Sequence, residues 1–220
     1  MGHRAALGAG NPTLERYVIS VDITSKRYGH PDDGNVVLGR VAFDLNAGDS
    51  LAITGPSGVG KSTLLRIVAG LDDEFEGTID RCDAFSMVFQ EPTLLPWRSV
   101  IQNLTLLHSE VSTAQAQAML VEVGLGDKTN DWPQQLSLGQ QRRLSLARAF
   151  LGQPELLILD EPFVSLDEAT HADMLSLTQE LLTNSGAATL LVTHDVAEAK
   201  QLTQRVCELR GNPASLYEVV

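Results

Sequence analysis

The stretch Gly55–Thr63, GPSGVGKST, decides how the rest of the chain is interpreted. It places Gly55, Gly60, Lys61 and Ser62 in the spacing of a phosphate-binding loop. Glycines let the backbone approach a phosphate chain closely, so that successive N–H groups and the positive end of the next helix face the anion. The motif predicts that the Lys61 ammonium reaches the outer phosphates and that the Ser62 hydroxyl is a magnesium ligand.

The sequence on both sides of this loop has the character that the motif requires. Ser50–Thr54 is short and apolar, which is typical of a buried strand, and Ser62–Leu71 has the composition of a helix. The alternative is a chance glycine-rich turn before a helix, which would require every fixed position to match by coincidence. We therefore expect a strand, a phosphate loop and a helix.

Composition and charge narrow the class of protein. The chain has 220 residues, is 43% hydrophobic and 20% charged, and carries a formal net charge of −12. This length predicts a single main domain with a sizeable core. The acidic balance argues against nucleic-acid binding, which relies on clustered Lys and Arg. The first residues, MGHRAALGAGNP, lack a hydrophobic secretory segment, and no apolar run is long enough to span a bilayer, so we expect a cytoplasmic protein.

Strand and helix patterns alternate along most of the chain. Strand-like runs are expected at Tyr17–Thr24, Val36–Leu38, Val41–Leu45, Ser50–Thr54, Glu76–Asp80, Ser86–Gln90, Leu156–Leu159 and Thr189–Thr193. The pattern from Pro92 to about Leu151 is helical, and Glu168–Thr183 has helical spacing between two apolar strands. The fold class predicted is α/β: a parallel-sheet core with the phosphate loop, an antiparallel β lobe before it and a helical subdomain at about 92–151, within one domain of residues 1–220. Because the segment 210–220 is short, we expect no regulatory domain in it.

Two acids follow the apolar strand Leu156–Leu159. Phosphoryl transfer to water needs a magnesium ligand and a group that orients the water. Asp160 can reach a magnesium ion held by Ser62, and Glu161 can act as the base. The alternative is that both acids simply begin a polar loop, which would be the better interpretation if the phosphate loop were absent. Ser137–Gln140 likewise has two interpretations, a helix cap or an anion site at a helix N-terminus.

Taken together, these motifs resemble the nucleotide-binding subunits of ABC transporters, with a match that runs from Tyr17 to about Leu209. The chain carries the motifs of that family in the family's order: Gly55–Thr63 as Walker A, Gln90 as the Q-loop, Leu136–Gln140 as the signature, Leu156–Glu161 as Walker B, Ser165–Asp167 as the D-loop and His194 as the switch histidine. A signature shortly before Walker B, with a histidine after the next strand, is specific to this family.

The resemblance implies a role for each matched residue in an ATPase that uses ATP and Mg²⁺. Glu161 activates water, His194 contacts the γ-phosphate, and Gln90 contacts the metal or the water. The implied magnesium ligands are Ser62, Gln90 and Asp160, and the implied catalytic residues are Glu161, His194, Gln90 and Lys61. The implied nucleotide-binding residues are Tyr28, which stacks on adenine; Gly55, Pro56, Ser57, Gly58, Val59, Gly60, Lys61, Ser62 and Thr63; and Ser137, Gly139, Gln140 and Asp167.

The resemblance also implies partners. Two ATPase subunits pack head to tail, so that Ser137 and Gly139 face the ATP of the other copy and Asp167 lies in the interface. The expected working form is a homodimer or paired subunit on transmembrane permease subunits at the cytoplasmic face of the membrane, with a solute-binding protein in the full system and no nucleic acid. The sequence departs from the family at Leu138, where the usual residue is Gly, so a side chain replaces a position with freedom at positive φ.

A narrower resemblance concerns Val88–Val100, VFQEPTLLPWRSV, which is similar to the Q-loop region of importers for nitrate, sulfonates and taurine. It implies import of a small solute, and Leu94, Leu95, Pro96 and Trp97 either dock the permease or pack within the helical subdomain. The alternatives are an ABC-type ATPase of an exporter or of a non-transport complex. A phosphate-loop kinase fits less well because of the signature and His194, and a small regulatory GTPase fits less well because the chain lacks an Asn-Lys-x-Asp base-reading motif.

Overall fold

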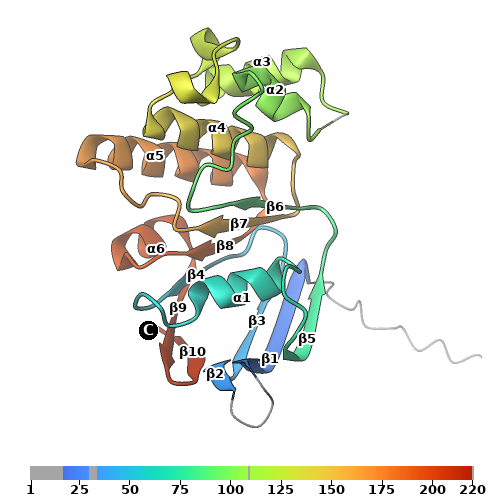
Figure 1. The fold of residues 1–220 in the computed structure, drawn as a ribbon, viewed down its shortest axis with the longest axis vertical. Helices are drawn as coiled ribbons and strands as arrows, with labels where there is room; N and C mark the ends of the chain where they lie inside the picture. Colours follow the sequence, from blue (N-terminus) through green and yellow to red (C-terminus); the bar gives the residue numbers. More distant parts are fainter. Residues whose placement is uncertain (1–16, 30–33, 109, 220) are drawn as a thin grey trace, which may run out of the picture.

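The structure is a computed structural model that describes residues 17–29, 34–108 and 110–219; the N-terminal MGHRAALGAGNP lies outside them. Ten strands form one sheet, with helices packed on it (Figure 1). The strands are β1 (Ile19–Tyr28), β2 (Asn35–Leu38), β3 (Val41–Leu45), β4 (Ser50–Thr54), β5 (Glu76–Arg81), β6 (Phe85–Val88), β7 (Leu156–Asp160), β8 (Ala188–Val192), β9 (Arg205–Gly211) and β10 (Ala214–Glu218). The helices are α1 (Lys61–Val68), α2 (Val100–Thr105), α3 (Thr113–Glu122), α4 (Leu138–Leu151), α5 (Glu168–Ser185) and α6 (Val196–Leu202), with short 3-10 helices η1 (Gly126–Lys128) and η2 (Pro133–Gln135).

The sheet has a parallel half and a mainly antiparallel half. The parallel half runs in the order β9, β4, β8, β7, β6, and every neighbouring pair in it is parallel. On the other side, β10 pairs antiparallel with β9, and β1 pairs antiparallel with β2, β3 and β5. The predicted α/β class, with a parallel core and an antiparallel lobe, is confirmed. The carboxyl ends of β4 and β7 therefore point to the same edge, which is where open parallel sheets bind ligands.

The parallel strands separate two hydrophobic cores. In β7, Leu156 and Ile158 pack with α1 and the β lobe, whereas Leu157 and Leu159 pack with the core that holds the other helices. Successive strand residues face opposite sides of a sheet, so strands covered on both faces are apolar throughout. Figure 1 shows α1 on its own near the β lobe and α4 and α5 stacked beyond β7.

Three segments differ from the sequence-based expectation. The first strand, which was expected to end at Thr24, continues to Tyr28. The segment 92–99 forms turns before α2 and is not helical. The buried Asn103 side chain accepts from the N–H of Leu95 and donates to its carbonyl, so these backbone groups have side-chain partners in place of helical ones. The C-terminal strands β9 and β10 were not predicted from the sequence.

The sequence predicted no membrane-spanning segment. None of the helices formed by the described residues combines the length and apolar character needed to cross a bilayer. The longest, α5, is an amphipathic helix whose buried residues include Met174 and Leu181.

Candidate functional site

The loop between β4 and α1 is held in a narrow space by neighbouring strands. Gly55 has φ 152° and Gly60 has φ 117°, both in the region that side-chain-bearing residues avoid. A Cβ on Gly55 would lie 2.5 Å from the carbonyl oxygen of Leu209 in β9, and a Cβ on Gly60 would lie 2.8 Å from a methyl of Leu38 in β2. Both the turn and its packing therefore require glycine at these positions.

A cavity opens over this loop at the carboxyl edge of the parallel strands. Its volume is about 490 Å³, and its lining brings together loop residues and residues that are distant in sequence: Val37, Ser57, Gly58, Gly60, Lys61, Ser62, Thr63, Gln90 and Glu161. Pro56 and Val59 line an adjoining hollow of about 350 Å³ on the β2 side. The cavity thus gathers most of the phosphate-loop residues, together with Gln90 and Glu161, as the sequence suggested.

Lys61 is buried beneath the cavity and is the main positive charge of the loop. Its Nζ donates to the carbonyl oxygens of Gly55 at 2.8 Å and Pro56 at 3.2 Å, and it lies 3.4 Å from Oε1 of Glu161. As the first residue of α1, it stands where backbone N–H groups lack intrahelical partners. The ammonium and the helix end therefore face an anion from the same side.

Glu161 connects this lysine to the histidine that follows β8. Its backbone has φ 42°, and its N–H donates to the carbonyl of Val192 at 2.8 Å, which ties the turn after β7 to the neighbouring strand. Its second carboxylate oxygen, Oε2, lies 3.5 Å from Nδ1 of His194. Lys61, Glu161 and His194 thus form a continuous line of contacts, although they come from three separate segments. The left-handed backbone at Glu161 is a sparsely populated conformation of a kind that concentrates at functional sites.

Asp160, the last residue of β7, is partly buried beside these charges. Burial and the neighbouring Glu161 carboxylate raise the pKa of Asp160 to about 6, and Lys61 offsets only part of this increase. The carboxyl group therefore lies in surroundings that favour its neutral form unless a further cation is near. It is next to the cavity but does not line it.

The signature residues lie on a different part of the molecule. Ser137 is the N-cap of α4: its hydroxyl accepts from the N–H of Gln140, whose side chain accepts from the N–H of Ser137 in return. A Cβ on Gly139 would lie 2.7 Å from Cγ2 of Thr170 in α5, so the two helices approach closely there. Thr170 in turn donates to Asp167, the N-cap of α5.

These cap residues form a second cluster, apart from the cavity. None of Ser137, Gly139, Gln140 and Asp167 lines it. Hydrogen bonds from the hydroxyl and N–H of Thr170 hold the pKa of Asp167 below its ordinary value, so this cap stays ionised. Leu138 is the first residue of α4 and is 41% exposed. It is not among the residues with positive φ, so this backbone conformation does not require glycine, and the effect of the side chain on turnover stays a prediction.

Tyr28 lies outside the phosphate cavity as well. It ends β1, keeps 42% of its surface exposed, and donates its hydroxyl hydrogen to Oδ2 of Asp72 at 3.2 Å. The ring is therefore anchored at its edge while much of its surface is accessible.

Two sets of residues near the site were not found from the sequence. The buried Arg142 of α4 donates from Nη1 to the carbonyl of Pro162, next to Glu161, and burial lowers its pKa. The buried Glu198 of α6 accepts from Thr193 and contacts His171 of α5 at 2.7 Å, which fixes the residue before His194. A charged residue on the apolar face of a helix is a sequence signal that could have pointed to Arg142 and Glu198. This signal does not predict which residues they contact.

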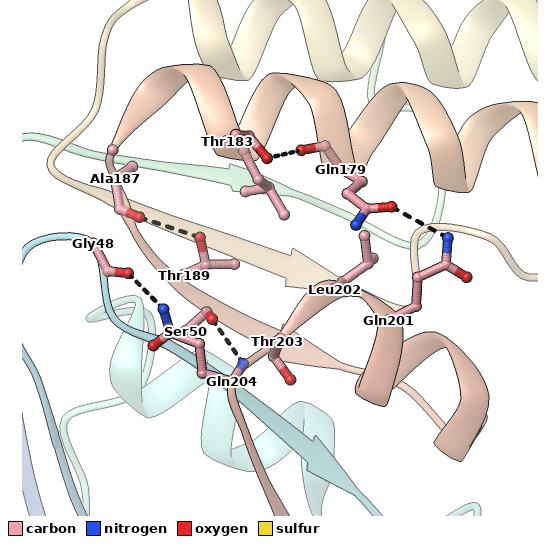
Figure 2. Close-up of a pocket in the computed structure, with 12 residues that line it drawn as sticks. Gly48, Ser50, Gln179, Thr183, Ala187, Thr189, Gln201, Leu202, Thr203 and Gln204 are labelled. Atoms are coloured by element: carbon pink, nitrogen blue, oxygen red, sulfur yellow. Dashed lines mark hydrogen bonds between the residues drawn. The ribbon is translucent and has the colours of Figure 1, made fainter.

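A second cavity of about 470 Å³ lies at the opposite, amino-terminal ends of β4 and β8 (Figure 2). Its polar lining consists of uncharged groups such as Gln179, Gln201 and Gln204, and Figure 2 shows several of them bonded to one another. It has neither a glycine loop nor a charged residue. The cavity over the phosphate loop is therefore the candidate site.

The parallel sheet, the glycine loop that opens a helix and the acids after β7 define a phosphate-loop nucleoside triphosphatase. Residues 38–164 match the family model described as ABC transporter, and the chain belongs to this family. It is an ATP-hydrolysing, nucleotide-binding subunit, as the sequence predicted.

Curated relatives match over most of the chain. It is 46% identical over 175 residues to the aliphatic sulfonates import ATP-binding protein SsuB 1 of Streptomyces avermitilis, covering 79% of this chain and 67% of the relative. It is 43% identical over 194 residues to SsuB 3 of Paraburkholderia xenovorans, covering 88% of this chain and 77% of the relative.

A solved structure supports the fold independently. The dimeric structure of the ATP-binding cassette MJ0796 in a post-hydrolysis state, bound to ADP and Pi, superposes with a TM-score of 0.77 at 26% identity. The superposition covers 91% of this chain and 97% of that one. The two proteins therefore share nearly their whole architecture.

Proposed function

We propose that this chain hydrolyses Mg²⁺-ATP in the cavity over the phosphate loop and thereby powers the import of a small solute. The observation that carries the proposal is the line of contacts from Lys61 and Glu161, which line this cavity, to His194, which contacts Glu161. Residues 1–220 would form a single ATPase domain in which residues about 92–151 are the helical subdomain.

The residues present fit ATP and magnesium. The cavity has a volume of about 490 Å³, and the loop glycines, the start of α1 and the Lys61 ammonium can face the phosphates. Ser62 and Asp160 would hold Mg²⁺, and the partly buried Asp160 carboxyl has the raised pKa expected of a site that needs a cation. When bound there, Mg²⁺ neutralises phosphate charge.

Glu161 has the position of the base. Its carboxylate would orient the attacking water and accept its proton, while His194 on the next strand would contact the transferred phosphate. Contacts with a cation on one oxygen and an imidazole on the other hold this carboxylate in one orientation. Gln90 lines the same cavity and would contact the metal or the water.

The second cluster would complete the site of another copy. The N–H groups at the start of α4 point away from their own helix, and Ser137 and Gln140 already satisfy each other as a cap. Together with Gly139 and Asp167, they would face ATP bound by a paired subunit, as in a head-to-tail dimer. The structural neighbour is itself dimeric.

We also propose that the dimer binds transmembrane permease subunits on the cytoplasmic face of the membrane, in a system that includes a solute-binding protein. Trp97 is 64% exposed next to Pro96, whereas Leu94 packs against the helical core. Buried Asn103 fixes this segment through the carbonyls of Leu95, Arg98 and Ser99. A rigid loop that presents an exposed indole suits docking.

The relatives are import ATP-binding proteins for aliphatic sulfonates, which favours import over export and favours aliphatic sulfonates as the solute class. We extend this solute class to the transporter that the present chain powers. The binding of the solute would belong to the other subunits, so it is tested on the whole system by uptake of a labelled alkanesulfonate.

The direct test of the ATPase proposal is the mass in solution of Glu161→Gln, measured by light scattering with and without Mg²⁺-ATP. Without its base the protein should trap ATP and change from monomer to dimer. Glu155→Gln is a matched control, because Glu155 stands just before β7 and is exposed; it should hydrolyse ATP and show no trapped dimer. A Glu161→Gln protein that does not bind ATP would contradict the proposal.

A further inference from the structure

An irregularity in β1 changes which residues face the interior of the β lobe. Up to Ile23, alternate residues of this strand are buried. Its register with β5 then shifts between Ile23 and Ser25, and its register with β2 shifts between Lys26 and Arg27. Such bulges re-aim the following side chains. Lys26 is consequently the next buried residue of the strand.

Lys26 is a buried cation with a defined set of partners. Its side chain has 0% exposure, and its Nζ donates to Oδ1 of Asp72 and to the carbonyl of Glu74, both at 2.7 Å. The same Nζ lies over the Tyr28 ring, 4.5 Å from its centroid. A buried ammonium is costly unless it is paired, so these contacts offset the cost of burying Lys26.

Asp72 joins the lysine and the tyrosine in one network. It accepts from Lys26 with one carboxylate oxygen and from the Tyr28 hydroxyl with the other, at 2.7 and 3.2 Å. The Asp72 side chain is 11% exposed. Although burial raises its pKa, hydrogen bonds from Lys26 and from the N–H of Glu74 lower it below the ordinary value, so this carboxyl is ionised at neutral pH.

The network leaves part of the ring available. The ammonium occupies one face of Tyr28 and the carboxylate holds its hydroxyl edge, yet the residue keeps 42% of its surface exposed. A cation on one face withdraws negative charge from the π system, which improves stacking of an electron-rich ring on the other face. Fixing the ring beforehand also reduces the entropy lost on stacking.

We propose that Lys26 and Asp72 are positioning residues that hold the Tyr28 ring as a platform for the purine base, so that they set affinity for the base without affecting affinity for the phosphates. This inference rests on the proposed function, because it takes ATP as the ligand. It gives Lys26, the buried charged residue of β1, a role in recognition of the base.

The test compares two probes with magnesium present, ATP and inorganic tripolyphosphate, by isothermal titration calorimetry. Base stacking on an aromatic residue gives about 5- to 100-fold in affinity, so Lys26→Met and Asp72→Asn should each weaken ATP binding about 5- to 10-fold. Tripolyphosphate binding should stay within about 2-fold, because the phosphate loop is not altered. Lys200→Met is a matched control at an exposed lysine of α6 and should change neither affinity.

A double-mutant cycle separates positioning from a structural role. If Lys26 acts through Tyr28, then Lys26→Met should have no further effect on ATP affinity in a Tyr28→Ala background. Equal loss of ATP and tripolyphosphate affinity, or an undiminished effect in Tyr28→Ala, would overturn the inference. The isosteric Asp72→Asn provides the same comparison if Lys26→Met does not fold. A wild-type chain that binds neither probe would refute the proposed function itself, and the positioning role with it.

Discussion

The phosphate cavity and the α4–α5 edge differ in how their polar groups are arranged. At the cavity, charged side chains from three segments contact one another, with Lys61, Glu161 and His194 linked by distances of 3.4 and 3.5 Å. At the edge, Ser137 and Asp167 each satisfy the start of their own helix. At the cavity, charged side chains already face one another across a site that can take a ligand. At the edge, the polar side chains are occupied in capping their own helices. This difference is why we assign them to two halves of a shared site.

The largest expected effect that tests this contrast comes from Gly139→Ala. The added methyl would lie 2.7 Å from Cγ2 of Thr170 and would push the starts of α4 and α5 apart. Misplacing groups at a composite site by a fraction of an ångström should lower turnover about 10- to 100-fold. ATP binding to the monomer, measured by calorimetry, should not change, because Gly139 does not line the cavity.

A second substitution makes this prediction specific. Thr170→Ser removes the obstructing methyl and keeps the hydroxyl that donates to Asp167. The double variant Gly139→Ala, Thr170→Ser should therefore recover most of the turnover. Weaker ATP binding by monomeric Gly139→Ala would show that the edge and the cavity are not separate.

A smaller effect concerns the ionisation of Asp160 beside the cavity. The pKa of Asp160 is about 6 in the folded protein, against an ordinary value of 3.8, so the folded state binds this proton more tightly than the unfolded chain. Stability should fall as pH rises from about 4 to about 6, by about 1–2 kcal/mol once partial exposure is allowed for. Asp160→Asn should remove this loss.

Urea unfolding without nucleotide or metal, at pH 4.5 and pH 7.5, checks the prediction. The stability advantage of Asp160→Asn over the wild type should be larger at the higher pH. An advantage that is the same at both values would mean that ionisation of Asp160 is not the cause.

The smallest expected effect is at Leu138. Its backbone is helical and its side chain is 41% exposed, so Leu138→Gly should cost less than about 1 kcal/mol of stability. Turnover should stay within about 2-fold, because the N–H groups at the start of α4 are present in either case. Steady-state hydrolysis at saturating ATP measures this, and an increase of more than about 5-fold would show that the leucine side chain obstructs the edge.

The sequence was sufficient for the parts of the site that depend on local spacing. Glycine, lysine and serine positions in one loop predict a strand, a turn and a helix, and two acids after an apolar run predict the end of a parallel strand. Glu161 and His194 lie together because β7 and β8 are adjacent and parallel, so that their carboxyl ends meet at one edge of the sheet.

Contacts that depend on irregular backbone could not be predicted in this way. A bulge in β1 turns Lys26 inward, and its partner Asp72 is 46 residues away in sequence. Similarly, Arg142 reaches the carbonyl of Pro162 only because α4 packs beside the turn after β7. Neither periodicity nor motif spacing carries such information.

The alternation of β7 has a consequence for how this protein can change over evolutionary time. Leu156 and Ile158 fill one core while Leu157 and Leu159 fill the other. Deleting a single residue from this strand would turn the side chains on one side of the deletion to the opposite face of the sheet. Residues that fill one core would then face the other, and Asp160 and Glu161 would change direction as well. Insertions and deletions should therefore be tolerated in the surface turns and rejected in β7, because the same alternation of side chains sets both the packing of the two cores and the direction of the two acids.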